Sequence, residues 1–421
     1  MTPEIKHRIE QIRHGNVPEG YKKTKAGILP ADWDVYMLGD CLSRVEKPVE
    51  VKPNELYTQI GIRSHGKGLF YKEPVTGAAL GNKSVFWIEP DCFIVNIVFA
   101  WEQAIGKTTQ SEVGMIGSHR FPMYRPVNDR IDVDYLISYF LTKRGTDILG
   151  AASPGGAGRN KTLGQDRFLK SKIVLPPIEE QKKIAAILTT QDKVIELKEK
   201  RLGEKQRQKK YLMQQLLTGK KRLPGFSGEW KKVKIGSFIK EIDERSTVNN
   251  QYEILSVTKN GMVFQSSHFN KQIASENNVG YKVVRRGNLA FSTMNLWMGS
   301  LDTLRICDIG IVSPAYKVFE FNQSLIVVNF AENYMKSAEM IWLYKANSEQ
   351  GASIVRRNLD LQALLNSEVA LPDILEQNAI AEVLSAADRE IGLLRQDIEQ
   401  EKQKKKALMQ LLLTGIVRVK I

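Results

Sequence analysis

Residues 175–219 read LPPIEEQKKIAAILTTQDKVIELKEKRLGEKQRQKKYLMQQLLTG, and residues 371–415 read LPDILEQNAIAEVLSAADREIGLLRQDIEQEKQKKKALMQLLLTG. Matching residues keep one offset of 196 along the whole stretch, from Leu175 and Leu371 to Gly219 and Gly415, without a gap. Chance similarity between two lysine-rich helical stretches would give scattered matches in a drifting register. The sequence therefore contains an internal duplication, and the fold has to be argued from it.

Each copy has the pattern of one long helix. Prolines such as Pro176 are tolerated at a helix start, and Gly219 or Gly415 supplies the stop. Between these points apolar residues recur every seven positions, which is typical of a coiled-coil seam. From Glu179 to Leu217 such a helix would run roughly 58 Å at 1.5 Å per residue. The seam residues are Leu188, Ile195, Leu202, Leu212 and Leu216 in the first copy, and Leu384, Ile391, Ile398, Leu408 and Leu412 in the second.

The two helices are predicted to pair with each other. The first leaves one globular unit toward the other, and the second returns, so packed together they run antiparallel. An ordinary amphipathic core helix is the alternative, but the length and the sustained seam speak against it. A duplicated unit with pseudo-twofold symmetry presents two equivalent surfaces, which suits two copies of one partner. We therefore expect the seam residues to pack the helices together and to dock that partner.

A globular unit precedes each helix, and the two units share a layout. TKAGILPADWDVYMLGDCL at 24–42 parallels LTGKKRLPGFSGEWKKVKIGSFI at 217–239, and helical patterns follow at 134–143 and 338–345. The loops between such matches differ in nearly every residue. This predicts a mixed α/β fold (α+β) with two duplicated globular domains separated by two long antiparallel coiled-coil helices. The expected domains are 1–16 (N-terminal helix), 17–175 (first globular unit), 176–222 (central repeated helix), 223–371 (second globular unit) and 372–421 (C-terminal repeated helix).

Composition is that of a globular, soluble protein. Its 421 residues are enough for two or three domains, and 42% of them are hydrophobic. The longest apolar runs are far shorter than a membrane span, and the first residues lack a secretory apolar region. The three cysteines lie far apart, which fits neither a disulfide framework nor a zinc ribbon. A cytoplasmic location without a membrane is expected.

Positive charge is concentrated on the central helix. The chain carries a formal net charge of +14, and residues 176–222 hold 13 Lys and Arg against 6 Asp and Glu. A basic total is a weak indication of a polyanionic partner. These charges could form a solvated helix face, or they could lie beside a phosphate backbone or an acidic partner.

No catalytic or metal-binding motif stands out. The sequence Gly106-Lys107-Thr108 resembles the last three residues of a phosphate-binding loop motif. That motif needs a glycine five residues earlier, where this chain has Trp101. The five histidines lack metal-ligand spacing, and no nucleophile with a base can be assigned. Neither a metal site nor a catalytic residue is predicted, so the sequence gives no positive reason to place an active site in this chain.

The repeated LPPIEEQ and LPDILEQ openings, the repeated LMQQLLTG and LMQLLLTG endings, and the LP…W entry to each unit resemble the specificity subunit of type I restriction–modification enzymes. The resemblance covers essentially the whole chain. It implies that 17–175 and 223–371 are target recognition domains, each reading half of a split DNA sequence. The repeated helices would set the spacing and hold the modification subunits. Because family members differ most within the recognition domains, no base contact transfers residue by residue.

Candidate base-reading residues come from the loops of each unit. Arginine pairs with guanine, and asparagine or glutamine pairs with adenine, in the major groove. Each candidate could instead be a turn residue or a solvated charge. They are Gln59, Arg63, His65, Lys67, Arg159, Asn160 and Lys161 in the first unit, and Lys259, Asn260, Asn295, Arg356, Arg357 and Asn358 in the second.

Two classes of function are compatible with these features. The resemblance implies a non-catalytic DNA-reading scaffold that binds double-stranded DNA, two modification (methyltransferase) subunits and two restriction subunits. It further implies that S-adenosylmethionine binds to the modification subunit and that this chain holds no cofactor. The alternative is a self-contained DNA-modifying enzyme with an unrecognised active site.

Overall fold

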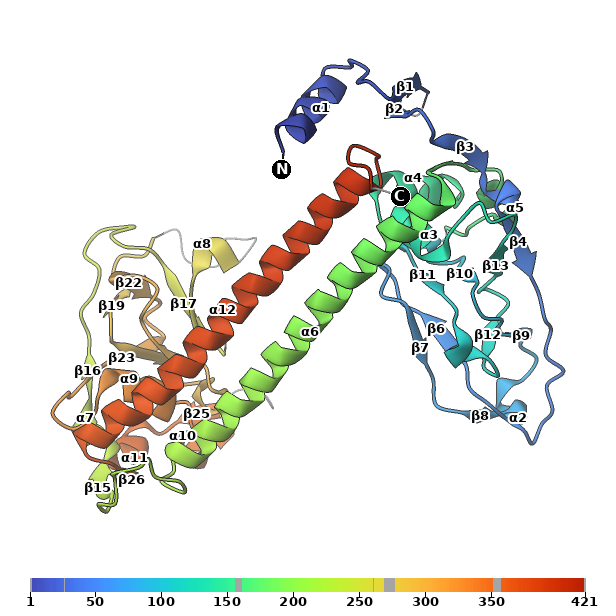
Figure 1. The fold of residues 1–421 in the computed structure, drawn as a ribbon. Helices are drawn as coiled ribbons and strands as arrows, with labels where there is room; N and C mark the ends of the chain where they lie inside the picture. Colours follow the sequence, from blue (N-terminus) through green and yellow to red (C-terminus); the bar gives the residue numbers. More distant parts are fainter. Residues whose placement is uncertain are drawn as a thin grey trace. The chain divides into compact units, whose positions relative to one another are not determined.

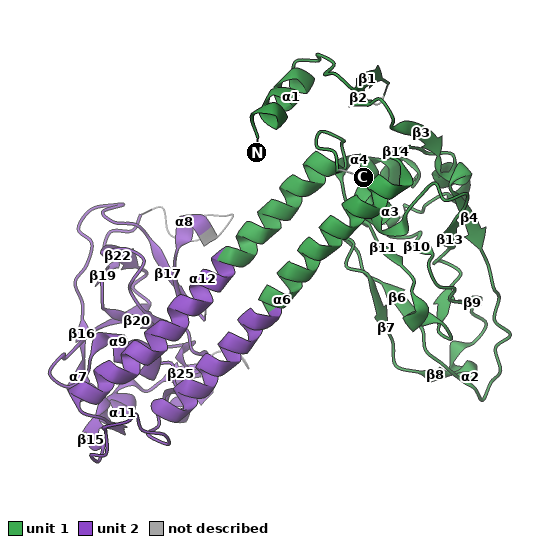
Figure 2. Ribbon diagram, viewed as in Figure 1, with its two compact units in different colours: residues 1–199, 397–421 green, residues 200–396 purple. Residues whose placement is uncertain are grey.

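A computed structural model describes residues 2–25, 27–155, 161–259, 261–268, 277–350 and 357–419 of the protein. Two compact units divide the chain (Figure 2): residues 1–199 with 397–421 form the first, and residues 200–396 form the second. Each unit therefore contains one globular part and one half of each long helix.

The two long helices are α6 (Ile178–Leu216) and α12 (Ile374–Leu412), labelled in Figure 1. Their bounds differ by the offset of the repeats, so the prediction of one long helix per repeat is confirmed. Gly219 and Gly415 follow the helix ends with φ of 67° and 73°. This left-handed backbone costs glycine little, which explains why both copies end at this residue type.

Side-chain pairs fix the direction of the two helix segments in the first unit. Gln191 Nε2 donates to Glu401 Oε2 at 2.7 Å, and Lys198 Nζ lies 2.8 Å from Glu401 Oε1. Lys405 Nζ lies 2.6 Å from Asp192 Oδ1. Earlier residues of α6 thus pair with later residues of α12, and within this unit the segments run antiparallel. Lys198, followed by Gln191, holds the pKa of the Glu401 carboxyl at about 2.

The second unit repeats this arrangement. Lys209 Nζ lies 2.6 Å from Asp388 Oδ1, and Lys205 Nζ lies 2.9 Å from Glu390 Oε1. The Lys209 pair is the counterpart of the Lys405 pair, so the lysine that interrupts each seam has a carboxylate opposite it. Exposed ion pairs stabilise a fold little, but they discriminate between registers. Lys198, Arg201, Lys205 and Lys209 of the central helix α6 thus each pair with a carboxylate of α12.

The first unit is built on a four-stranded antiparallel sheet in the order β11-β10-β13-β4. Its strands are β4 (Leu42–Val45), β10 (Phe93–Val95), β11 (Ile105–Lys107) and β13 (Met123–Pro126). Two-stranded pairs surround it: β1 (Tyr21–Thr24) with β2 (Gly27–Pro30), β3 (Asp34–Met37) with β14 (Lys172–Leu175), β5 (Leu56–Tyr57) with β8 (Val75–Thr76), β6 (Ile60–Ile62) with β7 (Leu69–Tyr71), and β9 (Val85–Trp87) with β12 (Ile116–Ser118). Its shorter helices are α1 (Pro3–Arg13), α2 (Gly77–Leu80), α3 (Val133–Phe140), α4 (Lys143–Ala151) and α5 (Gln165–Leu169).

The second unit has the matching sheet order β21-β20-β23-β16. Its strands are β16 (Ile239–Ile242), β20 (Leu289–Ser292), β21 (Leu301–Thr303) and β23 (Tyr316–Phe321). The pair of β15 (Lys231–Lys234) with β26 (Glu368–Leu371) corresponds to β3 with β14. Further pairs are β17 (Leu255–Thr258) with β18 (Gly261–Phe264), β19 (Lys282–Arg285) with β22 (Ile309–Val312), and β24 (Ser348–Gln350) with β25 (Arg357–Leu359). The shorter helices are α7 (Ile235–Phe238), α8 (Gln265–His268), α9 (Val328–Tyr334), α10 (Ala338–Ala346) and α11 (Leu361–Asn366).

The main core of each unit includes both repeat helices. In the first unit Leu188 of α6 and Leu412 of α12 are buried in one cluster with the aromatic core. In the second unit Leu384 of α12 and Leu216 of α6 take the same places. The outer seam residues therefore belong to globular cores, where truncating a buried leucine costs about 2–5 kcal/mol.

One helical expectation is wrong in detail. The pattern at 134–143 was expected as a single helix, but α3 ends at Phe140 and Lys143 begins α4. The Thr142 hydroxyl accepts from the Gly145 amide at 3.1 Å and caps the new helix. The N-terminal helix and the pattern at 338–345 correspond to α1 and α10.

Candidate nucleic-acid interface

A buried carboxylate ties the start of α6 to the end of the chain. Glu180 is fully buried, and Arg418 donates to both of its oxygens at 2.7 and 2.8 Å. The indole of Trp33 donates to the same carboxylate at 3.1 Å, and Arg418 also pairs with Asp32 at 2.7 Å. Three segments distant in sequence thus meet at one carboxylate, and bidentate geometry makes this a strong, directional contact.

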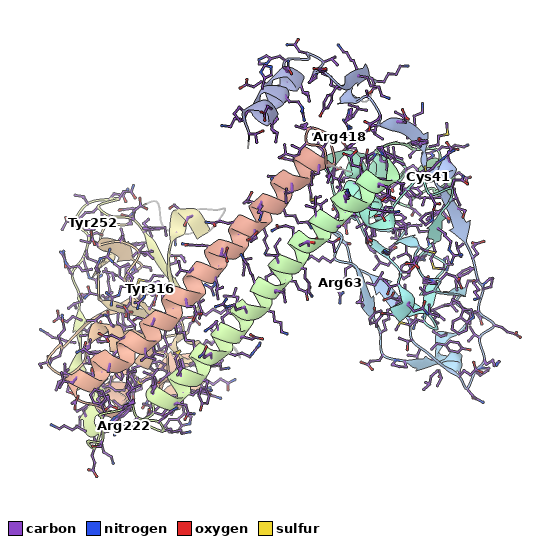
Figure 3. All side chains as sticks on the ribbon, viewed as in Figure 1. Cys41, Arg63, Arg222, Tyr252, Tyr316 and Arg418 are labelled. Carbon is purple, nitrogen blue, oxygen red and sulfur yellow. The ribbon has the colours of Figure 1, made fainter. Side chains whose placement is uncertain are left out.

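The second unit contains the same anchor at an offset of 196 (Figure 3). Arg222 donates to both oxygens of Glu376 at 2.6 and 2.5 Å, and Glu376 is 1% exposed. Trp230 donates to that carboxylate at 3.2 Å. The sequence patterns singled out the tryptophan of each LP…W entry but not Arg222 and Arg418, which share the repeat offset and could have been found by it.

Loss of one anchor arginine is expected to destabilise its own unit. Arg222→Met leaves the Glu376 carboxylate buried without its cation, which costs about 3–5 kcal/mol in comparable buried pairs. The midpoint of thermal unfolding should fall clearly. The double variant Arg222→Met with Glu376→Met should recover much of the loss because no charge stays buried. Lys220→Met, at an exposed position nearby, is the matched control, and an equal loss in the control would contradict the buried-charge explanation.

A buried glutamine holds each helix start against its globular part. Gln181 Nε2 donates to the carbonyls of Arg130 and Pro176, and its Oε1 accepts from the Asp132 amide at 3.0 Å. Gln377 makes the equivalent three bonds in the second unit. Both side chains are fully buried. The glutamine of each repeat opening is therefore a structural residue that bonds to backbone groups, which leaves the facing side chains free to vary.

Two of the candidate reading segments of the first unit meet at one turn. The amides of His65 and Gly66 donate to the carbonyls of Glu102 and Gln103 at 2.7 and 2.9 Å. Lys161 Nζ lies 5.4 Å from the ring centre of Trp101, in the same turn. The turn between β10 and β11 thus brings the loop at 63–68 beside the segment at 161.

The candidate side chains of the first unit differ in their exposure and in their contacts within the unit. Arg63, labelled in Figure 3, is exposed, but it donates to the Leu69 carbonyl at 2.7 Å and stacks on Phe70. His65 and Lys67 are exposed on the loop that follows. Gln59 is half-buried between β5 and β6, away from the loop tip. Arg159 and Asn160 lie outside the described residues.

The candidates of the second unit lie on two segments. Lys259 is exposed at the turn after β17, and Asn295 is half-buried between β20 and β21. The Arg357 amide donates to the Met294 carbonyl at 3.3 Å, which places the start of β25 beside Asn295. Arg357 Nη2 donates to the Ser348 carbonyl at 2.5 Å, so one nitrogen of its guanidinium already makes a hydrogen bond within the unit. Asn358 is exposed, and Asn260 and Arg356 lie outside the described residues.

A cationic groove borders the reading loop of the first unit. It has a volume of about 1020 Å³ and is lined by His65 and Lys67, by the start of α4, and by the end of α12 including Lys406. A smaller groove of about 510 Å³ lies at the matching place of the second unit, between the start of α10 and the end of α6. Lys210 lines it at the repeat position of Lys406. Both grooves can attract anions such as phosphate.

The seam residues divide into buried and half-buried positions. The half-buried ones among those predicted are Leu202, Leu212 and Leu408, and the other seven are buried. Leu212 and Leu408 pack against the cores of the second and first units respectively. Other large apolar residues of the helices are exposed, among them Tyr211 and Leu375. Leu197 is 53% exposed, and Leu393, its repeat counterpart, is 66% exposed.

Neither a metal cluster nor a membrane-spanning helix occurs within the described part of the chain. Its His, Cys, Asp and Glu side chains form no group of three or more that could hold a metal ion. Every helix described is too short or too polar to cross a membrane.

Comparison with known proteins gives one consistent family. A family model described as "Type I restriction modification DNA specificity domain" matches residues 70–204. Two relatives from Methanocaldococcus jannaschii, the putative type I restriction enzyme MjaX specificity subunit and the MjaVIII specificity subunit, are each 25% identical over 96% of this chain and 97% of their own length. By sequence, this chain is similar to type I specificity subunits over nearly its whole length.

Solved structures agree on the fold of this chain. The HsdS subunit of Thermoanaerobacter tengcongensis is 18% identical, with a TM-score of 0.51 over 92% of this chain and 98% of that one. A chain from a study of assembly of the type I R-M system is 17% identical, with a TM-score of 0.59 over 92% and 99%. The S subunit of M. genitalium is 12% identical, with a TM-score of 0.51 over 90% and 96%. The predicted mixed α/β fold with two long helices is confirmed.

Proposed function

We propose that this specificity subunit reads a bipartite DNA sequence, one half with each globular unit, and directs a separate methyltransferase to it. The main observation behind this proposal is that both globular units have the same scaffold but different loops. The two units share sheet order, anchors and helix ends, while the loop at 63–68, between β6 and β7, and the turn at Lys259, between β17 and β18, differ in residues and length. Base readers are expected to vary while their support does not.

Charge supports DNA as the ligand. Lys67 and Lys406 line the groove beside the reading loop of the first unit, and Lys210 lines the matching groove of the second. Phosphate contacts of this kind position a protein on a duplex, and loop side chains then select the bases. A protein that binds host DNA has to be in the same compartment as that DNA, so we propose a cytoplasmic location.

The methyl-transfer chemistry is assigned to the partner subunit. We expect S-adenosylmethionine to bind there, because no catalytic constellation emerged from the sequence of this chain. The purified chain incubated with DNA and labelled S-adenosylmethionine should transfer no methyl group, and adding the modification subunit should restore transfer. Transfer by the chain alone would support the alternative of a self-contained enzyme.

Two modification subunits are proposed to dock on the long helices, with restriction subunits joining the same assembly. Leu197 and Leu393 support this, because both copies of the repeat keep a leucine exposed at the same position. An exposed leucine covered by a partner contributes about 1.5–3 kcal/mol. The half-buried Leu212 and Leu408 contact their own cores, so their truncation is expected to reduce stability as well as docking.

Leu197→Asp with Leu393→Asp should therefore lower recovery of the modification subunit at least tenfold in co-purification, since a charge replaces buried apolar area. Folding should be unaffected because both positions face solvent. Leu375→Asp is the matched control: it is 74% exposed on α12, and the other copy has Glu179 there. Full recovery by the double variant would contradict docking at these leucines.

A further inference from the structure

The same tight turn occurs once in each unit. It joins β10 to β11 in the first unit, both labelled in Figures 1 and 2, and β20 to β21 in the second. Phe99 and Asn295 precede the turn with φ/ψ of −122°/20° and −121°/5°. Gln103 and Gly299 close it in the left-handed region, with φ of 60° and 80°. The backbone thus enters and leaves both turns with similar dihedral angles.

Hydrogen bonds and packing hold both turns alike. The Gln103 amide donates to the Ala100 carbonyl at 2.8 Å, and the Gly299 amide donates to the Leu296 carbonyl at 2.8 Å. Ala100 and Leu296 are fully buried under the turns. A turn with this backbone support and a buried anchor presents its outward side chain in a fixed direction, which is what a base-reading residue needs.

The outward side chain differs between the units. Phe99 is 42% exposed, so its ring is accessible to a ligand outside the unit. Asn295 occupies the same place in the second unit, and its amide makes no capping hydrogen bond to its turn. The turn is supported through backbone bonds in both cases, so neither side chain is needed to form it.

Basic residues flank both positions. In the first unit the loop at 63–68 bonds to this turn, and Lys161 lies over its tryptophan. In the second unit the amide of Arg357 bonds to the carbonyl of Met294, next to Asn295. A side chain that reaches solvent from a rigid turn beside basic residues is placed to meet a base edge when those residues meet phosphates.

We propose that Phe99 and Asn295 are specificity-determining residues that contact one base each, in the first and second half-site respectively. Phe99 suits the methyl group of thymine, and Asn295 suits the N6 and N7 atoms of adenine, the pairings that side-chain geometry favours in the major groove. The inference rests on the proposed function and adds to it the residue and the base class in each unit.

The test uses the complete complex of this chain with its modification subunit and a DNA library randomised at the positions of both half-sites. Phe99→Ala should lower the preference for thymine at one position of the first half-site by roughly 5- to 100-fold, and leave the second half-site as it was. Asn295→Asp, which keeps the shape but loses the amide donor, should lower the preference for adenine at one position of the second half-site by a similar factor.

Val113→Ala is the matched control in the first unit, because Val113 is 47% exposed on a different turn. It should leave every position unchanged. If Phe99→Ala alters no position, or weakens all positions of the first half-site together with thermal stability, the side chain is structural and the inference is overturned. A wild-type complex that reads no bipartite sequence would instead overturn the proposed function itself.

Discussion

Exchanging residues 17–175 for the first recognition unit of another type I specificity subunit should replace one half-site of the DNA target completely and leave the other half-site unchanged. The reason is that each unit has its own sheet and its own core. The buried Gln181 bonds to backbone groups of that unit, so it tolerates foreign side chains. The donor must supply a tryptophan at position 33, because Glu180 accepts from its indole.

The measurement is the methylated sequence produced by the hybrid with the modification subunit. The reciprocal exchange of residues 223–371 is the control, and it should change the other half-site only. A hybrid that alters both half-sites, or neither, would show that the two units do not read independently.

Inserting four residues after Lys200 in α6 should lengthen the unread spacer by one or two base pairs and leave both half-sites unaltered. Four helical residues span about 6 Å, which is nearly two base pairs at roughly 3.4 Å each. The insertion also rotates the C-terminal part of the helix by about 40°, whereas two base pairs rotate DNA by roughly 70°. The segment at 219–224 can absorb that difference.

Two further insertion variants serve as controls. The same four residues placed after Gln396, the repeat counterpart of Lys200, restore equal helix lengths and should give the same spacer with better stability. Four residues placed after Gly228, outside the helices, should leave the spacer as it was. A spacer of unchanged length together with an altered half-site would show that the helices do not set the spacer length.

Much of the helical architecture could be predicted because it depends on local periodicity. The helix expected from Glu179 to Leu217 is α6 (Ile178–Leu216), and its copy lies at the repeat offset. The role of the lysine that interrupts each seam could not be predicted from the sequence of one helix alone. Its partner, Asp388 for Lys209, lies on the other helix.

The site could be predicted only in part, because it is assembled from contacts distant in sequence. The loop at 63–68 and Lys161 were both singled out as polar loop segments, but no local pattern says that the turn at 99–103 joins them. Arg418 and Glu180 are 238 positions apart, so their pairing needs the fold. Whether the chosen residues read bases stays a prediction.

The most direct test is single-molecule methylation sequencing of a host that expresses this chain with its modification subunit. The proposed function predicts one methylated sequence with two specified half-sites separated by an unspecified spacer of constant length. Exchanging one recognition unit should replace one half and keep the other. A single continuous target, or methylation without sequence preference, would contradict the claim that two units on one scaffold read two DNA half-sites.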